Sequence, residues 1–270
     1  MKFQSIPEYE SISDDTILWR YMDLPKFLDV LINKHIVFTR PDLFEDVFES
    51  YPYKFREASK EAFYRNGEKT LGDFIDDRLV NSHRVAKYHI YISCWHINSF
   101  ESAGMWKLYG KHSDSLVIKT TVKKLKQSLI DPNNSWVNHL FYGKVNYDLN
   151  LDKLTEEFCD LVKKKEAIEI DIRHVLYNKR ESFEHEKEFR VLGINNSNLF
   201  GHPDLEKLSD SELKKITPSF QSIKCNIDNL IDEIIIAPDA QNWIVDLIKS
   251  TFEHLGYNFK VNQSELYKLK

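Results

Sequence analysis

The segment of residues 177–192 constrains the fold more than any other part of this chain. From Glu186 onward charged and apolar residues alternate, and side chains of a β-strand change face at every residue. The pattern therefore predicts that Glu186, Glu188 and Arg190 share one face of a strand. It also predicts that Phe189 and the apolar residue two positions later face a core. The charged face fits either a catalytic arrangement or a solvated strand surface with cross-strand pairs.

Composition bounds the class of protein. A chain of 270 residues with 42% apolar residues can bury a large core and is not disordered. The formal net charge of -5 gives no general attraction to nucleic acid or to anionic membranes. No window approaches the roughly 20 apolar residues that a membrane helix needs, and the start of the chain lacks the apolar run of a signal peptide. Three scattered cysteines favour a reducing compartment. We therefore expect a soluble, cytoplasmic protein.

Hydrophobic periodicity predicts helices mixed with strands and gives no internal repeat or linker. We expect one α+β domain over residues 1–270, with a mixed β-sheet core flanked by helices. Residues 1–15 are predicted to be an N-terminal arm, and residues 195–209 a flexible loop. The longest helix is predicted at residues 151–175, and a strand–helix–strand unit at 230–261.

Five short motifs, spread over nearly the whole chain, together resemble a bacterial family named domain of unknown function 2971. The chain departs from the family at Glu45-Asp46-Val47-Phe48, where Asn-Asp-Pro-Phe is usual, and at Phe183, where a Trp is usual. The motifs are Leu18-Trp19-Arg20-Tyr21; Phe38-Thr39-Arg40-Pro41 with residues 44–49; Ser93-Cys94-Trp95 with Met105, Trp106 and Tyr109; Lys179, Phe183, Glu186, Glu188 and Arg190; and Ile234-Ile235-Ile236-Ala237-Pro238.

The order of Arg20, Ser93 and Glu186-Lys187-Glu188 is similar to one branch of the ADP-ribosyltransferase superfamily. That branch carries an Arg on its first strand, a Ser on a central strand and Glu-x-Glu on a later strand. The resemblance implies an enzyme that uses NAD for ADP-ribosyl transfer or hydrolysis. It also implies an unknown macromolecular acceptor, no metal, and a role as a bacterial toxin or anti-phage effector.

The carboxylates carry the chemistry in this hypothesis. Loss of nicotinamide builds positive charge on the ribose, and a fixed carboxylate stabilises it. By the resemblance, Glu188 has this role and Glu186 orients or deprotonates the acceptor. Arg190 keeps Glu188 ionised by proximity. We expect Glu188→Gln to abolish NAD turnover and to leave the melting temperature within a few degrees.

The remaining predicted site residues bind NAD. Arg20 is expected to bind the phosphates through bidentate hydrogen bonds from its planar guanidinium group, and Tyr21 is the next residue of the same motif. Ser93 is expected to hold Glu188 in place, and Trp95 or Trp106 to stack on a ring. Each of these residues taken alone also fits an ordinary structural role, such as a surface ion pair of Arg20 or core packing of Trp106.

Two other functions stay open. In a metal-dependent nuclease, Asp46 or Glu49 would bind a divalent cation together with Glu186, Glu188 and Lys187. The Asp…Glu-x-Lys spacing that is usual in such nucleases is not met here. In the transferase hypothesis, nucleic acid is expected only as an acceptor or target. In a non-catalytic ligand- or protein-binding module, the aromatic and acidic side chains of residues 44–53 would form a partner pocket.

Overall fold

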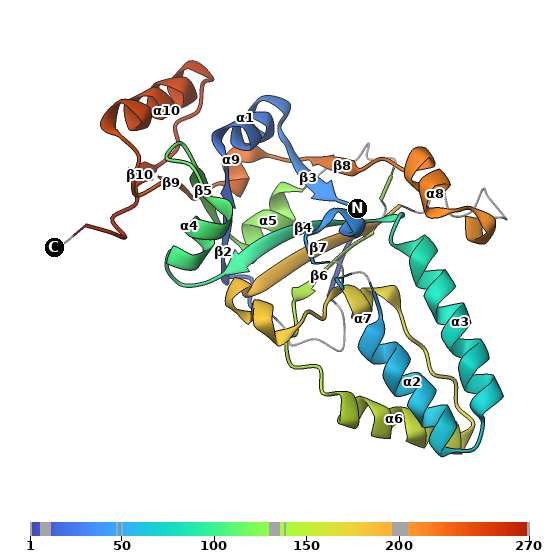
Figure 1. Ribbon diagram of the computed structural model, residues 1–270. Helices are drawn as coiled ribbons and strands as arrows, with labels where there is room; N and C mark the ends of the chain where they lie inside the picture. The colour runs from blue at the N-terminus through green and yellow to red at the C-terminus, as the bar shows by residue number, and fades with distance from the viewer. Residues whose placement is uncertain are drawn as a thin grey trace.

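The strand that begins at Glu188 lies in the middle of a mixed sheet (Figure 1). The computed structural model describes residues 2–5, 12–46, 48–49, 51–129, 136–137, 139–195 and 205–268. The strands in these residues are β1 (Lys2–Ser5), β2 (Ile17–Met22), β3 (His35–Thr39), β4 (Ile90–Ile97), β5 (Leu116–Thr121), β6 (His139–Lys144), β7 (Glu188–Ile194), β8 (Phe220–Lys224), β9 (Glu233–Ile236) and β10 (Val261–Gln263).

These ten strands form one sheet in the order β1-β6-β7-β4-β2-β5-β9-β10, with β3 paired to β4 and β8 paired to β3. β1 runs parallel to β6 and β10 runs parallel to β9, whereas the other pairs are antiparallel. The predicted mixed sheet flanked by helices is confirmed. The three strands that carry Arg20, Ser93 and Glu188 are neighbours, in the order β2-β4-β7.

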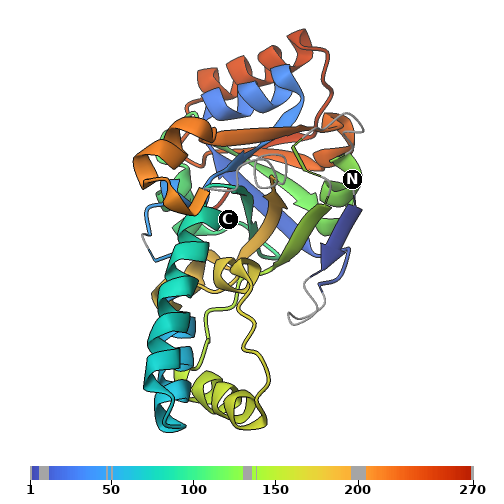
Figure 2. The same ribbon diagram turned by 90° about the vertical axis from the view of Figure 1, so that its right-hand side faces the viewer.

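Helices cover the sheet at two ends. Figures 1 and 2 show α1 and α10 together on one side, whereas α2, α3 and α6 extend as a group from the other end. No helix in the described residues is long and apolar enough to cross a bilayer. The α-helices are α1 (Leu24–Asn33), α2 (Tyr53–Arg65), α3 (Lys69–Ala86), α4 (Ala103–Tyr109), α5 (Val122–Ser128), α6 (Leu151–Lys164), α7 (Ile172–Leu176), α8 (Asp210–Ile216), α9 (Ile227–Leu230) and α10 (Asn242–His254), and the 3₁₀ helices are η1 (Pro41–Leu43), η2 (Glu181–Glu186) and η3 (Leu205–Lys207).

β7 is buried on both faces. Phe189 and Val191 belong to the main hydrophobic core, as predicted. On the other face, Glu188 is 6% exposed and Arg190 is 0% exposed, so this face is not a solvated surface. The alternating pattern therefore separates a hydrophobic core from a buried polar site, and burial of such charges requires close ionic partners.

The helix predicted at residues 151–175 is two helices. α6 ends at Lys164 because Lys165 adopts a left-handed backbone conformation with φ 58°. α7 begins only at Ile172, where the Asp171 side chain accepts a hydrogen bond from the backbone of the first turn. The single long helix is therefore wrong, and α3, with 18 residues, is the longest helix in the described residues.

Parts of the two segments predicted to be irregular are ordered elements. Residues 2–5 of the predicted arm form β1 at the edge of the sheet, whereas residues 1 and 6–11 lie outside the described residues. Residues 196–204 of the predicted loop lie outside them as well. The rest of that loop contains η3 and Ser209, which begins α8 with a reciprocal capping box to Glu212.

Candidate functional site

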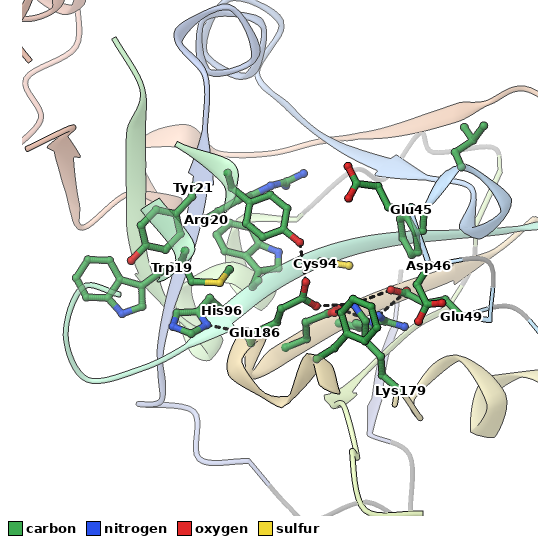
Figure 3. Close-up of a pocket in the computed structure, with 18 residues that line it drawn as sticks. Trp19, Arg20, Tyr21, Glu45, Asp46, Glu49, Cys94, His96, Lys179 and Glu186 are labelled. Atoms are coloured by element: carbon green, nitrogen blue, oxygen red, sulfur yellow. Dashed lines mark hydrogen bonds and ion pairs between the residues drawn. The ribbon is translucent and has the colours of Figure 1, made fainter. Parts of the chain in front are cut away.

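A cavity of about 320 Å³ lies where β2 separates from β4 (Figure 3). β2 pairs with β4 only at Leu18 and Trp19, and β3 pairs with β4 at Ile92. The sheet is open between these two contacts. As a result Arg20 and Glu186, which approach from different sides of the sheet, line the same cavity.

The base of the cavity holds three carboxylates and two cations, here called the cavity cluster. Lys179 Nζ lies 2.7 Å from Glu49 Oε1 and 2.8 Å from Glu188 Oε1, and it also contacts Glu186 Oε2. Arg190 lies 2.7 Å from Glu49 Oε2 through Nη2 and 2.7 Å from Glu188 Oε2 through Nε. Each of the five side chains is at most 8% exposed. With all groups ionised, the cluster keeps one uncompensated negative charge.

Glu186 reaches this cluster from the end of a helix. It is the last residue of η2, and Lys187 follows it with a left-handed φ of 40°. The prediction that Glu186 belongs to the strand is therefore wrong, although its carboxylate and that of Glu188 contact the same ammonium group. Tyr109, the last residue of α4, donates a hydrogen bond to Glu186 Oε1 at 3.0 Å. Tyr109 is 48% exposed and links Glu186 to the solvent side.

The environment of the cluster shifts the pKa values of Glu186 and Glu188 in opposite directions. Burial, and next the Glu188 carboxylate, raise the pKa of Glu186 to about 7, against the opposing effect of Lys179. Burial also opposes ionisation of Glu188, but Arg190 and Lys179 outweigh it and hold the pKa of Glu188 well below its usual value. Near neutral pH, Glu188 is a fixed charge and Glu186 is the group that can exchange a proton.

Arg20 and Ser93 interact with each other. Arg20 donates from Nη1 to Ser93 Oγ at 3.1 Å and from Nη2 to the Val37 carbonyl at 3.2 Å. Its guanidinium carbon lies 5.3 Å from the centre of the Trp95 ring, and Trp95 Nε1 donates to Ser93 Oγ at 3.2 Å. Arg20 thus bridges the opening between β2 and β3, with Trp95 stacked beneath it.

Ser93 does not hold Glu188. In the register of β4 and β7, Ser93 lies opposite Val191 and His96 lies opposite Glu188. Residues opposite each other share a face, and positions 93 and 96 of one strand lie on different faces. The expected contact is therefore wrong, and Ser93 positions Arg20 instead.

The Arg20 guanidinium carries a charge that no ion pair with a carboxylate of the described residues compensates. Burial lowers its pKa to about 10, so it remains a cation at neutral pH. Figure 3 shows this guanidinium above the Glu186 carboxylate in the view. The cavity therefore has an uncompensated positive charge and an uncompensated negative charge.

Two further side chains complete the wall. Tyr21 lines the cavity, and its hydroxyl accepts a hydrogen bond from the Ser102 backbone at 2.9 Å. His96 Nδ1 lies 2.6 Å from the Glu186 carbonyl, which can only accept, so Nδ1 carries the proton. Burial lowers the pKa of His96, so its ring is neutral and Nε2 is an acceptor.

Sequence reasoning missed three members of this site. Lys179 and Tyr109 stand in the recognised motifs, but nothing in the sequence indicates that they meet Glu186. His96 has no motif signal, although its position in β4 opposite the first residue of β7 follows from the strand register. That register is a tertiary property, so pairing of strands far apart in sequence was the missing information.

The carboxylates required by the nuclease alternative are engaged by cations. Asp46 accepts a hydrogen bond from Arg180 at 2.8 Å, and Lys179 occupies the centre of the three glutamates. Lys187 is exposed and takes no part in the cluster. Among the residues that the structure describes, no group of three or more His, Cys, Asp or Glu side chains could hold a metal ion. The geometry does not support a metal-dependent nuclease.

Comparison with known families agrees with the motifs. The family described as "Protein of unknown function (DUF2971)" matches residues 105–191. This part of the chain is similar to the DUF2971 family. The matched segment contains most of α4 with Tyr109, and Lys179, Glu186, Glu188 and Arg190 of the cavity. Arg20 and the other motifs before or after it lie outside the match. No curated protein matches the chain.

Proposed function

We propose that this protein cleaves the N-glycosidic bond between nicotinamide and ribose in NAD and passes the ADP-ribosyl group to an acceptor or to water. The observation that carries this proposal is the pair of uncompensated charges in one cavity, negative at Glu186 and positive at Arg20. NAD presents a matching pair, because its nicotinamide ring is cationic and its phosphates are anionic.

The cavity cluster supports the bond-breaking step. When the glycosidic bond lengthens, positive charge develops on the ribose, as in other glycosyl transfers. Ionised Glu186 gives the cluster its surplus negative charge, which stabilises that positive charge in a site largely closed to water. The same carboxylate, with a pKa raised to about 7, can then accept the proton of the attacking water or hydroxyl.

Glu188 has a different role in this proposal from the one the sequence suggests. Its two oxygens are held by Lys179 and Arg190 at 2.8 and 2.7 Å, so little of its charge is left for substrate. We assign the reacting carboxylate to Glu186, and to Glu188 the function of raising the pKa of Glu186. Arg20 binds a phosphate oxygen, and Ser93 and Trp95 hold its guanidinium in place.

The proposal is tested by incubating the purified protein with NAD and measuring released nicotinamide by chromatography. Glu186→Gln should lower the rate by at least ~100-fold, because general acid–base groups contribute about that much. Glu184→Gln is the matched control, because Glu184 is exposed on the same short helix. The proposal would be contradicted if the unaltered protein released no nicotinamide, both with and without cell extract as a source of acceptor.

We propose a biological setting that fits this chemistry. We place the reaction in the cytoplasm, where NAD is available to an enzyme in a reducing compartment. A macromolecular acceptor fits the 48% exposure of Tyr109, because an acceptor hydroxyl can approach Glu186 past that side chain. Depletion of NAD or modification of a host component would suit a toxin or an anti-phage effector.

A further inference from the structure

We propose that the cavity recognises a single pyridinium mononucleotide, so that the adenosine half of NAD is dispensable for binding and cleavage. The binding part stands on the cavity itself, and the cleavage part rests on the function proposed above. The predicted ligand class is a flat cationic base, a ribose and one phosphate. Nicotinamide mononucleotide is the simplest compound of this class.

The size of the cavity is the first argument. Small-molecule pockets range from about 300 to 1,000 Å³, and the 320 Å³ of this cavity lies at the lower end. Such a volume gives room for one nucleotide unit. A second nucleoside would have to lie outside, beyond the side chains that line the cavity.

The second argument is the number of available cations. Arg20, Lys179 and Arg190 are the basic side chains among the described lining residues. Lys179 contacts three carboxylates, and Arg190 contacts two carboxylates and the Leu176 carbonyl. Of these three side chains, Arg20 alone has no carboxylate partner in the described residues and can compensate the charge of a bound anion. One guanidinium group binds one phosphate group by bidentate hydrogen bonds. The second phosphate group of a pyrophosphate would find no further unengaged guanidinium or ammonium group among the described lining residues.

The third argument concerns the base. Of the buried side-chain acceptors that line the cavity in the described part of the chain, His96 Nε2 has no hydrogen-bond partner. Its lone pair can accept a hydrogen bond from the carboxamide N–H of nicotinamide. The surplus negative charge at Glu186 favours a cationic ring over a neutral one. His96 and Glu186 are joined through the Glu186 carbonyl, so both contacts come from one rigid unit.

The turnover experiment compares nicotinamide release from NAD, nicotinamide mononucleotide and nicotinamide riboside. We expect kcat/KM for the mononucleotide to lie within about tenfold of that for NAD. The riboside, which lacks phosphate, should be worse by ~10- to 100-fold, the usual worth of a charged hydrogen bond. Arg20→Gln should remove this difference, and Arg78→Gln, an exposed arginine that does not line the cavity, should retain it. Cleavage of NAD without cleavage of the mononucleotide would overturn the inference and leave the proposed function intact.

A binding experiment tests the ligand class without catalysis. Titration calorimetry of the protein with the mononucleotide and with the riboside should show tighter binding of the mononucleotide by ~10-fold or more, and Arg20→Gln should equalise the two. Arg20→Lys keeps the charge and should keep part of the preference, which covers the case in which Arg20→Gln fails to fold. Equal affinities in the unaltered protein would overturn the inference. Preferential binding without any NAD cleavage would support the binding part of the inference and overturn both its cleavage part and the proposed function.

Discussion

Two buried arginines of this protein are neutralised in different ways. Arg40, which is 2% exposed, donates to both carboxylate oxygens of Asp42 and to the Thr217 carbonyl and hydroxyl. This pair has one charge of each sign and lies outside the cavity wall. Arg190 instead shares two carboxylates with Lys179. Its cluster contains a third carboxylate and opens to a cavity.

The difference separates a structural ion pair from a site that can act. The Arg40 pair joins η1 to the residue that follows α8, and its balanced charges have no reason to exchange a proton or bind an ion. The cavity cluster holds one carboxylate more than its cations compensate, and the pKa of Glu186 moves to about 7 as a result of burial and of Glu188. An unbalanced buried cluster beside a cavity is therefore the better indicator of function.

The largest expected effect distinguishes two neighbouring carboxylates of the same cluster. Glu188→Gln should lower the free energy of unfolding by about 3–5 kcal/mol, because Glu188 is in contact with both Lys179 and Arg190 in the interior and the variant loses both ion pairs. Glu186→Gln should change it by less than about 1 kcal/mol at pH 8, because the surplus charge disappears. The expectation that Glu188→Gln is structurally mild is thus revised. Urea denaturation of both variants measures the difference, and equal losses would contradict the different roles assigned to the two carboxylates.

The next effect concerns the balanced pair. Arg40→Met should cost about 3 kcal/mol of stability, because Asp42 stays buried and its remaining ion-pair partner in the described residues is the exposed Lys214, at 3.9 Å. Nicotinamide release by the folded fraction should be unchanged, because Arg40 does not line the cavity. Thermal unfolding and the NAD assay at a temperature below both transitions test this together. A large loss of kcat at full folding would show that the two clusters are coupled.

The smallest effect is the dependence on pH. If Glu186 acts as a base, kcat/KM should fall about tenfold per pH unit below pH 7 and level off above it. The folded-state pKa of Glu186 lies above its ordinary value of 4.5, so the folded protein binds more protons in this window. Wild type should therefore lose stability relative to Glu186→Gln as the pH rises from about 4.5 to 7. A flat rate profile from pH 5.5 to 8.5 would remove Glu186 as the base.

The sequence predicts local elements well where a cap or a period marks them. Asp23 begins α1 by accepting a hydrogen bond from the Lys26 backbone, as its residue type indicates. Gly256, with φ 83°, follows the end of α10, where its residue type favours a left-handed conformation. The end of α6 could not be predicted, because Lys165 takes a left-handed conformation that is unfavourable for a residue with a side chain. In that conformation the backbone N–H of Lys165 donates to the Leu161 and Val162 carbonyls and closes the helix end.

In the candidate site, too, some features are set by the sequence and others by the tertiary structure. The order of residue types along the chain, and the alternation that buries Phe189 opposite Arg190, are properties of the sequence. Which side chains meet was decided by the register of β4 with β7 and by the separation of β2 from β4, because strand pairing turns each residue to one face. For that reason Arg20 contacts Ser93, whereas Lys179 and Glu186 meet across η2, which separates them in the chain; neither contact can be read from the spacing.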